Sequence, residues 1–407
     1  MIGTRGKRTL LLLGLLASIP LLGARACVTR TDYRERVLVA ARSDPRLRVA
    51  LVKEAPSVDI SASGPLLVYA SEATEPLLDL RSLDSVTVFS RLGKLVWGAQ
   101  LLHTATVRIA PSAGVSIEIN GAGYRGEVRI YADPKGAITC VNEVALETYL
   151  AGVLGSEVPT SWPDAALRAQ AIVARTYALS RAWDRRDALY DMTADTLSQV
   201  YRGLKFEDQV AFRIIHETRG VILVYSEKIF PTYYMSVCGG HTASAAKVFG
   251  DSAIPPLQGT TCGYCRGALR YRWPVGGAPV TISEETILSR LSPMGISLKS
   301  IDRIEGMQTS PDGFATRVSL RHGGEIFTVS AREFRMALGP DLLFSANFEA
   351  VKEGGNFVFS GRGWGHGVGM CQWGAHGMAR AGFDEREILR HYYPGAELVR
   401  LSPSPPG

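Results

Sequence analysis

The sequence contains the stretch Glu147-Thr-Tyr-Leu-Ala-Gly-Val-Leu-Gly-Ser-Glu-Val-Pro159, followed by Ala165-Ala-Leu-Arg-Ala-Gln-Ala-Ile-Val-Ala-Arg-Thr-Tyr-Ala178, and together they predict two consecutive helices. Apolar residues recur in the first helix at mostly three- and four-residue steps, with Asn142 as the expected N-cap and Gly155 as the expected end. The second helix is expected to begin near Pro163, which suits a first helical turn, and to reach about Trp183. Glu157 therefore lies in the turn between them, just before the stiff corner at Pro159.

The second helix has a narrow apolar stripe made mostly of small residues, which allows close packing: Leu167, Ala171, Ala174, Ala178 and Ala182. Arg168 and Arg175 are seven residues apart and share one face, so both can point at an anionic or polar partner. Arg175 has two interpretations. Either it holds a substrate carboxylate or Glu157 itself, or it bonds backbone carbonyls where the helix packs.

The remaining chain predicts an α+β fold with a β-rich N-terminal subdomain over residues 47–137. Short β-type runs separated by turn residues support this: 48–52, 66–69, 86–89, 106–109 and 128–131. A mixed helical and strand region follows over residues 138–400, with a mixed insert at about 275–347. Residues 401–407 are expected to form a disordered tail.

The N-terminus has the parts of a secretory signal peptide over residues 1–26. Three basic residues precede an apolar run from Leu10 to Leu22, and Ala24-Arg25-Ala26 provides a small-x-small exit. The apolar run is too short to span a bilayer, which needs about 20 residues. Export to the periplasm or another extracytoplasmic location is therefore expected.

Cleavage after Ala26 would make Cys27 the first mature residue, at the start of a polar tether over residues 27–46. Cys27 is thus a candidate for lipidation, which would attach the protein to a membrane. Two residues before Cys27, Arg25 stands where a small residue is usual in a lipidation site. Ordinary signal-peptidase cleavage is therefore the alternative.

The charge of the mature chain argues against a nucleic-acid partner. The full chain has a net charge of +6, and removal of the four basic residues of the signal segment leaves about +2. Nucleic-acid binding proteins usually carry a strongly basic stripe, which this balance does not favour.

Four residues in two short motifs predict a structural zinc site. Cys238-Gly-Gly-His241 is followed after 20 residues by Cys262-Gly-Tyr-Cys265, and three thiolates with one imidazole suit a closed tetrahedral site. Disulfides are the competing interpretation, because an exported protein can form them. Cys140 and Cys371 remain, either as buried thiols or as a pair.

A glycine-rich segment near the C-terminus is a candidate substrate loop. Gly361-Arg-Gly-Trp-Gly-His-Gly-Val-Gly369 has glycines that let backbone approach a ligand closely or adopt positive φ. Trp364 could stack on a sugar ring and His366 could donate to a sugar hydroxyl. The alternative is a tight structural loop with a hydrogen-bonded histidine.

Several separated blocks, in order, resemble the sporulation-stage-II protein D family. They comprise the two helical stretches above, Asp195-Thr-Leu-Ser-Gln-Val-Tyr-Arg-Gly203, the segment from Gly361 to Met370, Gln372-Trp-Gly-Ala375, and His391-Tyr-Tyr-Pro-Gly395. The resemblance covers roughly Tyr124 to Leu398. Cys371 stands where this family usually has Ser.

The resemblance implies lytic transglycosylase activity on peptidoglycan, preferably on glycan strands without stem peptides. It implies that Glu157 is the catalytic residue and that the family's helix arginine corresponds to Arg175. The residues expected to bind substrate are Arg175, Trp364, His366 and Gln372. Some members of the family carry a Cys/His zinc at the position of the two cysteine motifs. One carboxyl group is sufficient for this reaction, because Glu157 can first donate a proton to the glycosidic oxygen and then accept one from the C6 hydroxyl of the same sugar.

Two other functions remain as alternatives. The first is a non-catalytic glycan-binding module that stimulates a cell-wall amidase, as relatives described as amidase enhancers do. The second is a zinc hydrolase of stem peptides, which would need an incompletely coordinated metal. A role in sporulation does not follow from the family name.

Overall fold

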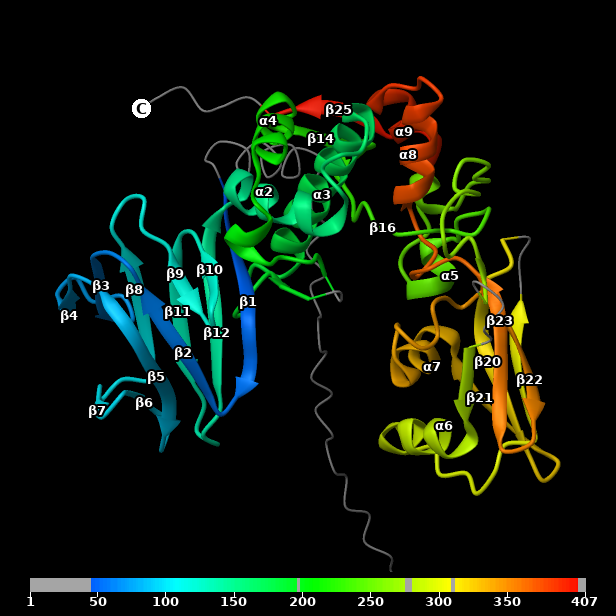
Figure 1. Cartoon of the computed structure of the whole chain (residues 1–407), viewed down its shortest axis with the longest axis horizontal. Coiled ribbons are helices and arrows are strands. Elements are labelled where there is room, and N and C mark those ends of the chain that lie inside the picture. Colours follow the sequence, from blue (N-terminus) through cyan, green and yellow to red (C-terminus); the bar gives the residue numbers. More distant parts are fainter. Residues whose placement is uncertain (1–44, 196–197, 275–279, 309–311, 402–407) are drawn as a thin grey trace, which may run out of the picture.

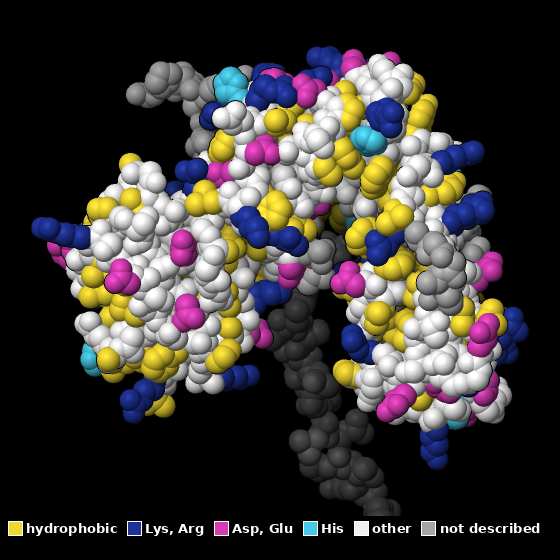
Figure 2. Space-filling model, in the orientation of Figure 1, with side chains coloured by type: hydrophobic (Ala, Val, Ile, Leu, Met, Phe, Trp, Pro, Cys, Tyr) yellow, Lys and Arg dark blue, Asp and Glu magenta, His cyan; other side chains and the backbone are white. Residues whose placement is uncertain are grey.

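The computed structural model describes residues 45–195, 198–274, 280–308 and 312–401, and it confirms the α+β class. A β-rich N-terminal unit and a second β-rich unit flank a layer of helices (Figure 1). The two flanking units stand apart below this layer, and Lys and Arg are interspersed with Asp and Glu on the face shown (Figure 2). The signal segment, Cys27 and the tail from Ser402 lie outside the described residues.

The N-terminal unit consists of two antiparallel-rich sheets that enclose a hydrophobic core. One sheet has the strand order β13-β1-β12-β11-β8-β3-β4, and the other has the order β10-β9-β2-β5-β6-β7. All five β-type runs expected from the sequence lie in these strands. The bounds are β1 Arg46–Ala55, β2 Ser57–Ala62, β3 Leu66–Ala70, β4 Pro76–Leu80, β5 Leu83–Arg91, β6 Lys94–Trp97, β7 Gln100–Leu101, β8 Thr106–Pro111, β9 Ile117–Ile119, β10 Ala122–Tyr124, β11 Glu127–Ala132, β12 Ile138–Ala145 and β13 Met192–Thr193.

The expected N-cap at Asn142 is wrong, because this residue lies inside strand β12. Its buried amide donates to the carbonyl oxygens of Arg125 and Glu127, at 2.9 and 3.0 Å, and its oxygen accepts from the Tyr201 hydroxyl. Helix α2 (Leu146–Glu157) begins after the strand without a side-chain cap.

Gly155 does not end helix α2, which continues to Glu157. A Cβ atom at Gly155 would lie 2.3 Å from the carbonyl oxygen of Phe206. The glycine therefore allows the close approach of a neighbouring chain segment.

Helix α3 (Asp164–Asp184) agrees closely with the expected second helix and starts directly after Pro163. Its residues from Ala169 to Ser180 are all buried. One side, including Leu167 and Ala171, belongs to the core of the N-terminal unit, whereas Ile172 and Val173 belong to a second core with the C-terminal helices. The small side chains expected from the sequence thus allow α3 to pack against both cores.

The elements around α3 complete the helical layer. Strand β14 pairs with β15 and β25, and β16 pairs in parallel with β24. Their bounds are η1 Gly203–Phe206, α4 Gln209–Glu217, β14 Val221–Tyr225, β15 Lys228–Ile229, β16 Tyr234–Met235, α5 Ala245–Phe249, η2 Pro255–Leu257, β24 Met370–Cys371, α8 Gln372–Arg380, α9 Glu385–Tyr392 and β25 Glu397–Arg400.

The second flanking unit has its own hydrophobic core between Trp273 and Phe359. One of its sheets has the order β17-β23-β18, with β22 also paired to β23, and the other has the order β19-β20-β21. The bounds are β17 Arg272–Trp273, β18 Val280–Ser283, α6 Glu284–Leu291, η3 Ser292–Met294, β19 Arg303–Gln308, β20 Ala315–His322, β21 Glu325–Ser330, α7 Ala331–Leu338, β22 Phe348–Glu353 and β23 Asn356–Arg362. Within the described ranges, every helix is too short or too polar to cross a membrane.

Candidate active site and metal centre

Glu157 is the last residue of α2, and its carboxylate meets three segments that are distant in sequence. Its Oε1 accepts from the backbone N–H of Val200 at 2.8 Å, and its Oε2 accepts from Nε2 of Gln372 at 3.4 Å. The hydroxyl of Tyr234 also hydrogen-bonds the carboxylate. The side chain remains partly exposed, so a ligand can reach it.

The pKa of Glu157 is raised above the usual value for a glutamate. Burial of the carboxyl group is the largest cause, and it outweighs the hydrogen bonds from Val200, Tyr234 and Gln372 and the charge of Arg202, all of which lower the pKa. A carboxyl group with a raised pKa retains a proton closer to neutral pH, as a general acid requires.

A second layer of side chains fixes the direction of the Tyr234 hydroxyl. Gln199 is fully buried, and its Nε2 donates to the Tyr234 oxygen at 3.1 Å and to the carbonyl oxygen of Ala174 at 3.2 Å. Its Oε1 accepts from the hydroxyl of Tyr149 at 3.1 Å. Because Gln199 donates to Tyr234, the Tyr234 proton is directed to Glu157. Sequence reasoning missed both Gln199 and Tyr234, although Gln199 lies in a block that resembles the family.

Gln372, expected from the sequence to bind substrate, lies beside Glu157. It is the first residue of α8 and is 6% exposed. Cys371 precedes it as the N-cap, and the Cys371 sulfur accepts from the backbone N–H of Gly374 at 3.3 Å. The position of the Gln372 amide therefore depends on how Cys371 is held.

The contacts of His366 are those expected of a hydrogen-bonded histidine in a tight structural loop. Its Nε2 donates to the carbonyl oxygen of Tyr234 at 2.9 Å, and its Nδ1 accepts from the backbone N–H of Val368 at 3.1 Å. Both ring nitrogens are thus occupied within the protein. Burial, with the charges of Arg335 and Arg332, lowers the pKa of His366 to about 4, so the ring is neutral at neutral pH.

Trp364 lies at the rim of the same loop and is paired through its backbone with Val237. The guanidinium carbon of Arg270 lies 4.2 Å from the centre of its indole ring. One face of the Trp364 ring is therefore covered by Arg270, which leaves less of the ring for the sugar stacking expected from the sequence.

Three other rings, from two segments of the chain, cluster in space. Trp162 follows Glu157 by five residues, and Trp373 follows Gln372 directly. The ring centres of Trp162 and Trp373 are 5.3 Å apart, and His376 lies 4.7 Å from Trp162 and 5.4 Å from Trp373. All three rings are partly exposed, as suits a surface on which a sugar can stack.

Arg175 corrects the expectation of a substrate-binding role. Its side chain is 0% exposed and forms a two-pronged ion pair with Glu147, at 3.0 and 2.7 Å. It also donates to the carbonyl oxygens of Val221 and Ile215. Arg175 therefore joins α3 to α2, β14 and the end of α4, as the packing interpretation predicts.

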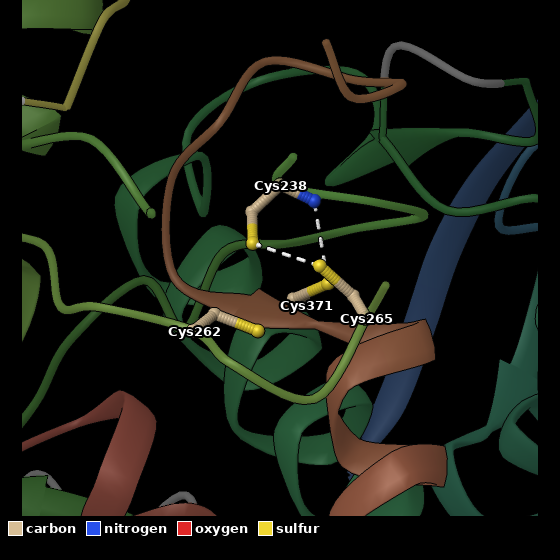
Figure 3. A group of neighbouring side chains, drawn as sticks. All are labelled: Cys238, Cys262, Cys265 and Cys371. Carbon is tan, nitrogen blue, oxygen red and sulfur yellow. Dashed lines mark hydrogen bonds between the residues drawn. The ribbon is translucent and has the colours of Figure 1, made fainter. Parts of the chain in front are cut away.

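Four buried cysteines bring their sulfur atoms together, and their ligand atoms all lie within 4.8 Å of one another: Cys238, Cys262, Cys265 and Cys371 (Figure 3). The Cys238 and Cys265 sulfurs are 3.6 Å apart, whereas four sulfurs at about 2.3 Å from a tetrahedral zinc are about 3.8 Å from one another. Burial and the three neighbouring sulfurs raise the pKa of Cys371 well above its usual value, and a bound cation would reverse this effect.

The fourth member of this cluster is Cys371 and not His241, which corrects the ligand set expected from the sequence. The His241 Nδ1 lies 2.7 Å from the carbonyl oxygen of Thr242. Cys371 instead arrives through the parallel pairing of β24 with β16, and it accepts from the backbone N–H of Cys238 at 3.3 Å. No short sequence spacing joins Cys371 to the other three, which is why the motifs did not reveal it.

Among the described residues one further cysteine, Cys140, is buried in β12 and unpaired. Burial raises the pKa of its thiol to about 12. It therefore belongs to the core of the N-terminal unit and not to the sulfur cluster.

Comparisons with known proteins found a matching family model and several relatives. A family model described as "Stage II sporulation protein" matches residues 134–225, which include Glu157. An uncharacterized protein of Brachyspira hyodysenteriae is 33% identical over 356 residues, which cover 87% of this chain and 92% of that protein. Stage II sporulation protein D of Bacillus amyloliquefaciens is 30% identical over 275 residues, or 63% of this chain and 75% of that protein. The amidase enhancer of Bacillus subtilis is 27% identical over 61% of this chain and 40% of its own length.

The ion pair between Arg175 and Glu147 predicts a large effect on stability. Glu147→Ala leaves the buried guanidinium without its carboxylate, so the free energy of unfolding should fall by about 3–5 kcal/mol. Glu217→Ala is the control, because Glu217 pairs with Arg213 at the surface and should change stability by less than about 1 kcal/mol. Urea unfolding followed by tryptophan fluorescence measures both, and equal losses would contradict the structural role of Arg175.

Proposed function

We propose that this chain, which belongs to the stage II sporulation protein D family, is a peptidoglycan lytic transglycosylase. The family supports a function related to the cell wall. The observation that carries the finer proposal is the pKa of Glu157, raised by burial although the residue still has exposed surface. Its substrate would be the bond between N-acetylmuramic acid and N-acetylglucosamine, preferably in strands without stem peptides.

In the first step, protonated Glu157 donates its proton to the glycosidic oxygen as positive charge develops on the muramic acid ring. The C–O bond breaks and the glucosamine hydroxyl leaves. The N–H groups of Val200 and Gln372 and the Tyr234 hydroxyl already point at the Glu157 oxygens. They stabilise the carboxylate that this step produces.

In the second step, ionised Glu157 accepts the proton of the C6 hydroxyl of the same muramic acid, and the C6 oxygen bonds to C1. This closes a 1,6-anhydro ring and returns the proton to Glu157. Water does not enter the reaction, so the pair of carboxylates used by ordinary glycosidases is not required. The partly exposed rings of Trp162 and Trp373 would hold the strand beside Glu157.

We propose that the sulfur cluster holds a structural Zn²⁺ through Cys238, Cys262, Cys265 and Cys371. Four thiolates complete a tetrahedral zinc and leave no position for a reacting water, so the zinc-hydrolase alternative has no support here. Gly374 lets α8 approach this cluster, since a Cβ atom there would lie 2.8 Å from the Cys262 sulfur. Because Cys371 precedes Gln372, this metal would also fix the start of α8 against Glu157.

A second candidate function is a glycan-binding module that stimulates a cell-wall amidase. The likeness to the Bacillus subtilis amidase enhancer favours this candidate. Such a module would bind strands through the same surface but would not need Glu157. Either function requires export, which the predicted signal segment would provide, with Cys27 as a site of lipid attachment in a lipoprotein form.

Glu157→Gln tests the proposed reaction. The amide cannot donate the acid proton, so the formation of anhydro-muramic ends should fall by about 10²- to 10⁴-fold. Residues 28–407 are incubated with peptide-free glycan strands, and mass spectrometry measures the products beside Glu217→Gln as the control. Strands that wild-type protein binds but leaves intact would favour the amidase-stimulating module.

Tyr234→Phe tests the cause of the pKa of Glu157. The hydrogen bond from Tyr234 lowers this pKa, so its removal should raise it further, by about one unit. Glu157 must be protonated to start the reaction, and activity falls as pH rises through its pKa. The fall should therefore move to higher pH in the variant. The control is Tyr233→Phe, whose hydroxyl contacts Asp251 and should leave the profile in place.

The metal proposal predicts different outcomes for two ligand candidates. Cys371→Ser removes one thiolate, so the protein should lose most of its bound zinc, whereas His241→Ala should retain it. Elemental analysis of the purified variants measures the zinc content per chain. Zinc loss in His241→Ala with retention in Cys371→Ser would restore the ligand set expected from the sequence.

A further inference from the structure

Arg270 lies in a corner formed by two aromatic rings. Its guanidinium carbon lies 4.2 Å from the centre of the Phe344 ring and 4.2 Å from the centre of the Trp364 ring. The two rings contact each other edge to face, with centres 6.3 Å apart. Contact with both rings restricts the orientation of the guanidinium group.

Backbone hydrogen bonds make this stack rigid. Trp364 exchanges two bonds with Val237, at 2.8 and 3.1 Å. The carbonyl oxygen of Phe344 accepts from the N–H of Gly365 and from the side chain of Arg335, at 2.9 and 3.2 Å. The carbonyl oxygen of Arg270 accepts from the N–H of Gly363 at 3.0 Å.

The polar edge of Arg270 lacks a protein partner within the part of the chain that the structure describes. Its side chain forms neither a hydrogen bond nor an ion pair there, and it is only partly exposed. Arg175, by contrast, is saturated by Glu147 and backbone carbonyls. Each ring centre is 4.2 Å from the guanidinium carbon and the two centres are 6.3 Å apart, so the rings meet the group at about a right angle and N–H donors on its open side remain available.

The stack is joined to the candidate active site by one loop. Trp364 is followed by His366, which donates to the carbonyl oxygen of Tyr234, and the same segment ends at Gln372. Val237, the backbone partner of Trp364, is three residues from Tyr234, or roughly 10 Å of extended chain. Arg270 and Glu157 are thus connected by a short path through this segment.

We propose that Arg270 binds the free lactyl carboxylate of a muramic acid residue in the glycan strand, and this inference rests on the proposed function. A stacked guanidinium presents two parallel N–H groups that match a carboxylate. A stem peptide joins this carboxylate in an amide bond, which removes its negative charge. Arg270 is therefore a specificity-determining residue that distinguishes peptide-free strands from peptide-bearing ones.

The test measures equilibrium binding and not cleavage, so that it is separate from the catalytic role of Glu157. Full mature protein carrying Glu157→Gln is titrated with peptide-free strands and with the same strands after their carboxylates are converted to neutral amides. Peptide-bearing strands form a third arm, which shows whether carboxylates of the peptide contribute. Arg270→Gln is compared with Arg272→Gln, an exposed arginine two residues away.

Arg270→Gln should weaken binding of the carboxylate strands about tenfold, the size expected for a hydrogen-bonded charge pair. The same variant should bind amidated strands as tightly as its parent, and Arg272→Gln should change neither. Equal loss on both strands, or no loss on either, would overturn the inference and leave Arg270 as part of a structural stack. Selective binding without cleavage by wild-type protein would support Arg270 and reject the transglycosylase proposal.

Discussion

The burial of helix α3 around most of its circumference constrains the rest of the structure. Its alanines allow the N-terminal core on one side and the core of the C-terminal helices on the other to approach the same helix. Arg175 lies on this helix with 0% exposure, and its charge is compensated by Glu147 of α2. A buried charge without its partner is strongly unfavourable, so α2 and α3 are held in one relative position. Because Glu157 is the last residue of α2, its position relative to α3 is fixed as well.

Around this fixed carboxyl group, the site is assembled from a loop, a strand and a helix that only the tertiary structure brings together. Val200, Tyr234 and Gln372 approach Glu157 from three segments. They donate hydrogen bonds that favour the ionised form, whereas burial favours the protonated form. The balance suits a group that must give up a proton and take one back. Cys371 belongs to the sulfur cluster and is also the N-cap of the helix that carries Gln372, so the cluster influences where Gln372 lies.

Local sequence patterns correctly predicted the helices and strands whose formation depends on neighbouring residues in the chain. The proline before α3 and the alternating runs of the N-terminal unit predicted their elements correctly. The prediction that Asn142 caps a helix was wrong, because a buried amide in a strand can also hydrogen-bond backbone groups.

In the site, the resemblance supplied Glu157 and Gln372, and the structure brings these two together. Cys371 could not be identified as a cluster member, because it reaches Cys238 only when β16 and β24 pair. Burial of Arg175 and the stack around Arg270 likewise depend on contacts between distant segments, which spacing in the sequence does not report.

The second flanking unit is connected to the rest of the chain where β17 pairs with β23. Trp273 and Gly361 are paired across β17 and β23, and a Cβ atom at Gly361 would lie 2.4 Å from the Trp273 ring. Most residues between these two pack around a core of their own. Yet this unit supplies Phe344, which covers one side of Arg270. On the proposal for Arg270, a change in this unit would alter strand selectivity through Phe344, whereas Glu157 and the groups that donate hydrogen bonds to it lie outside the unit.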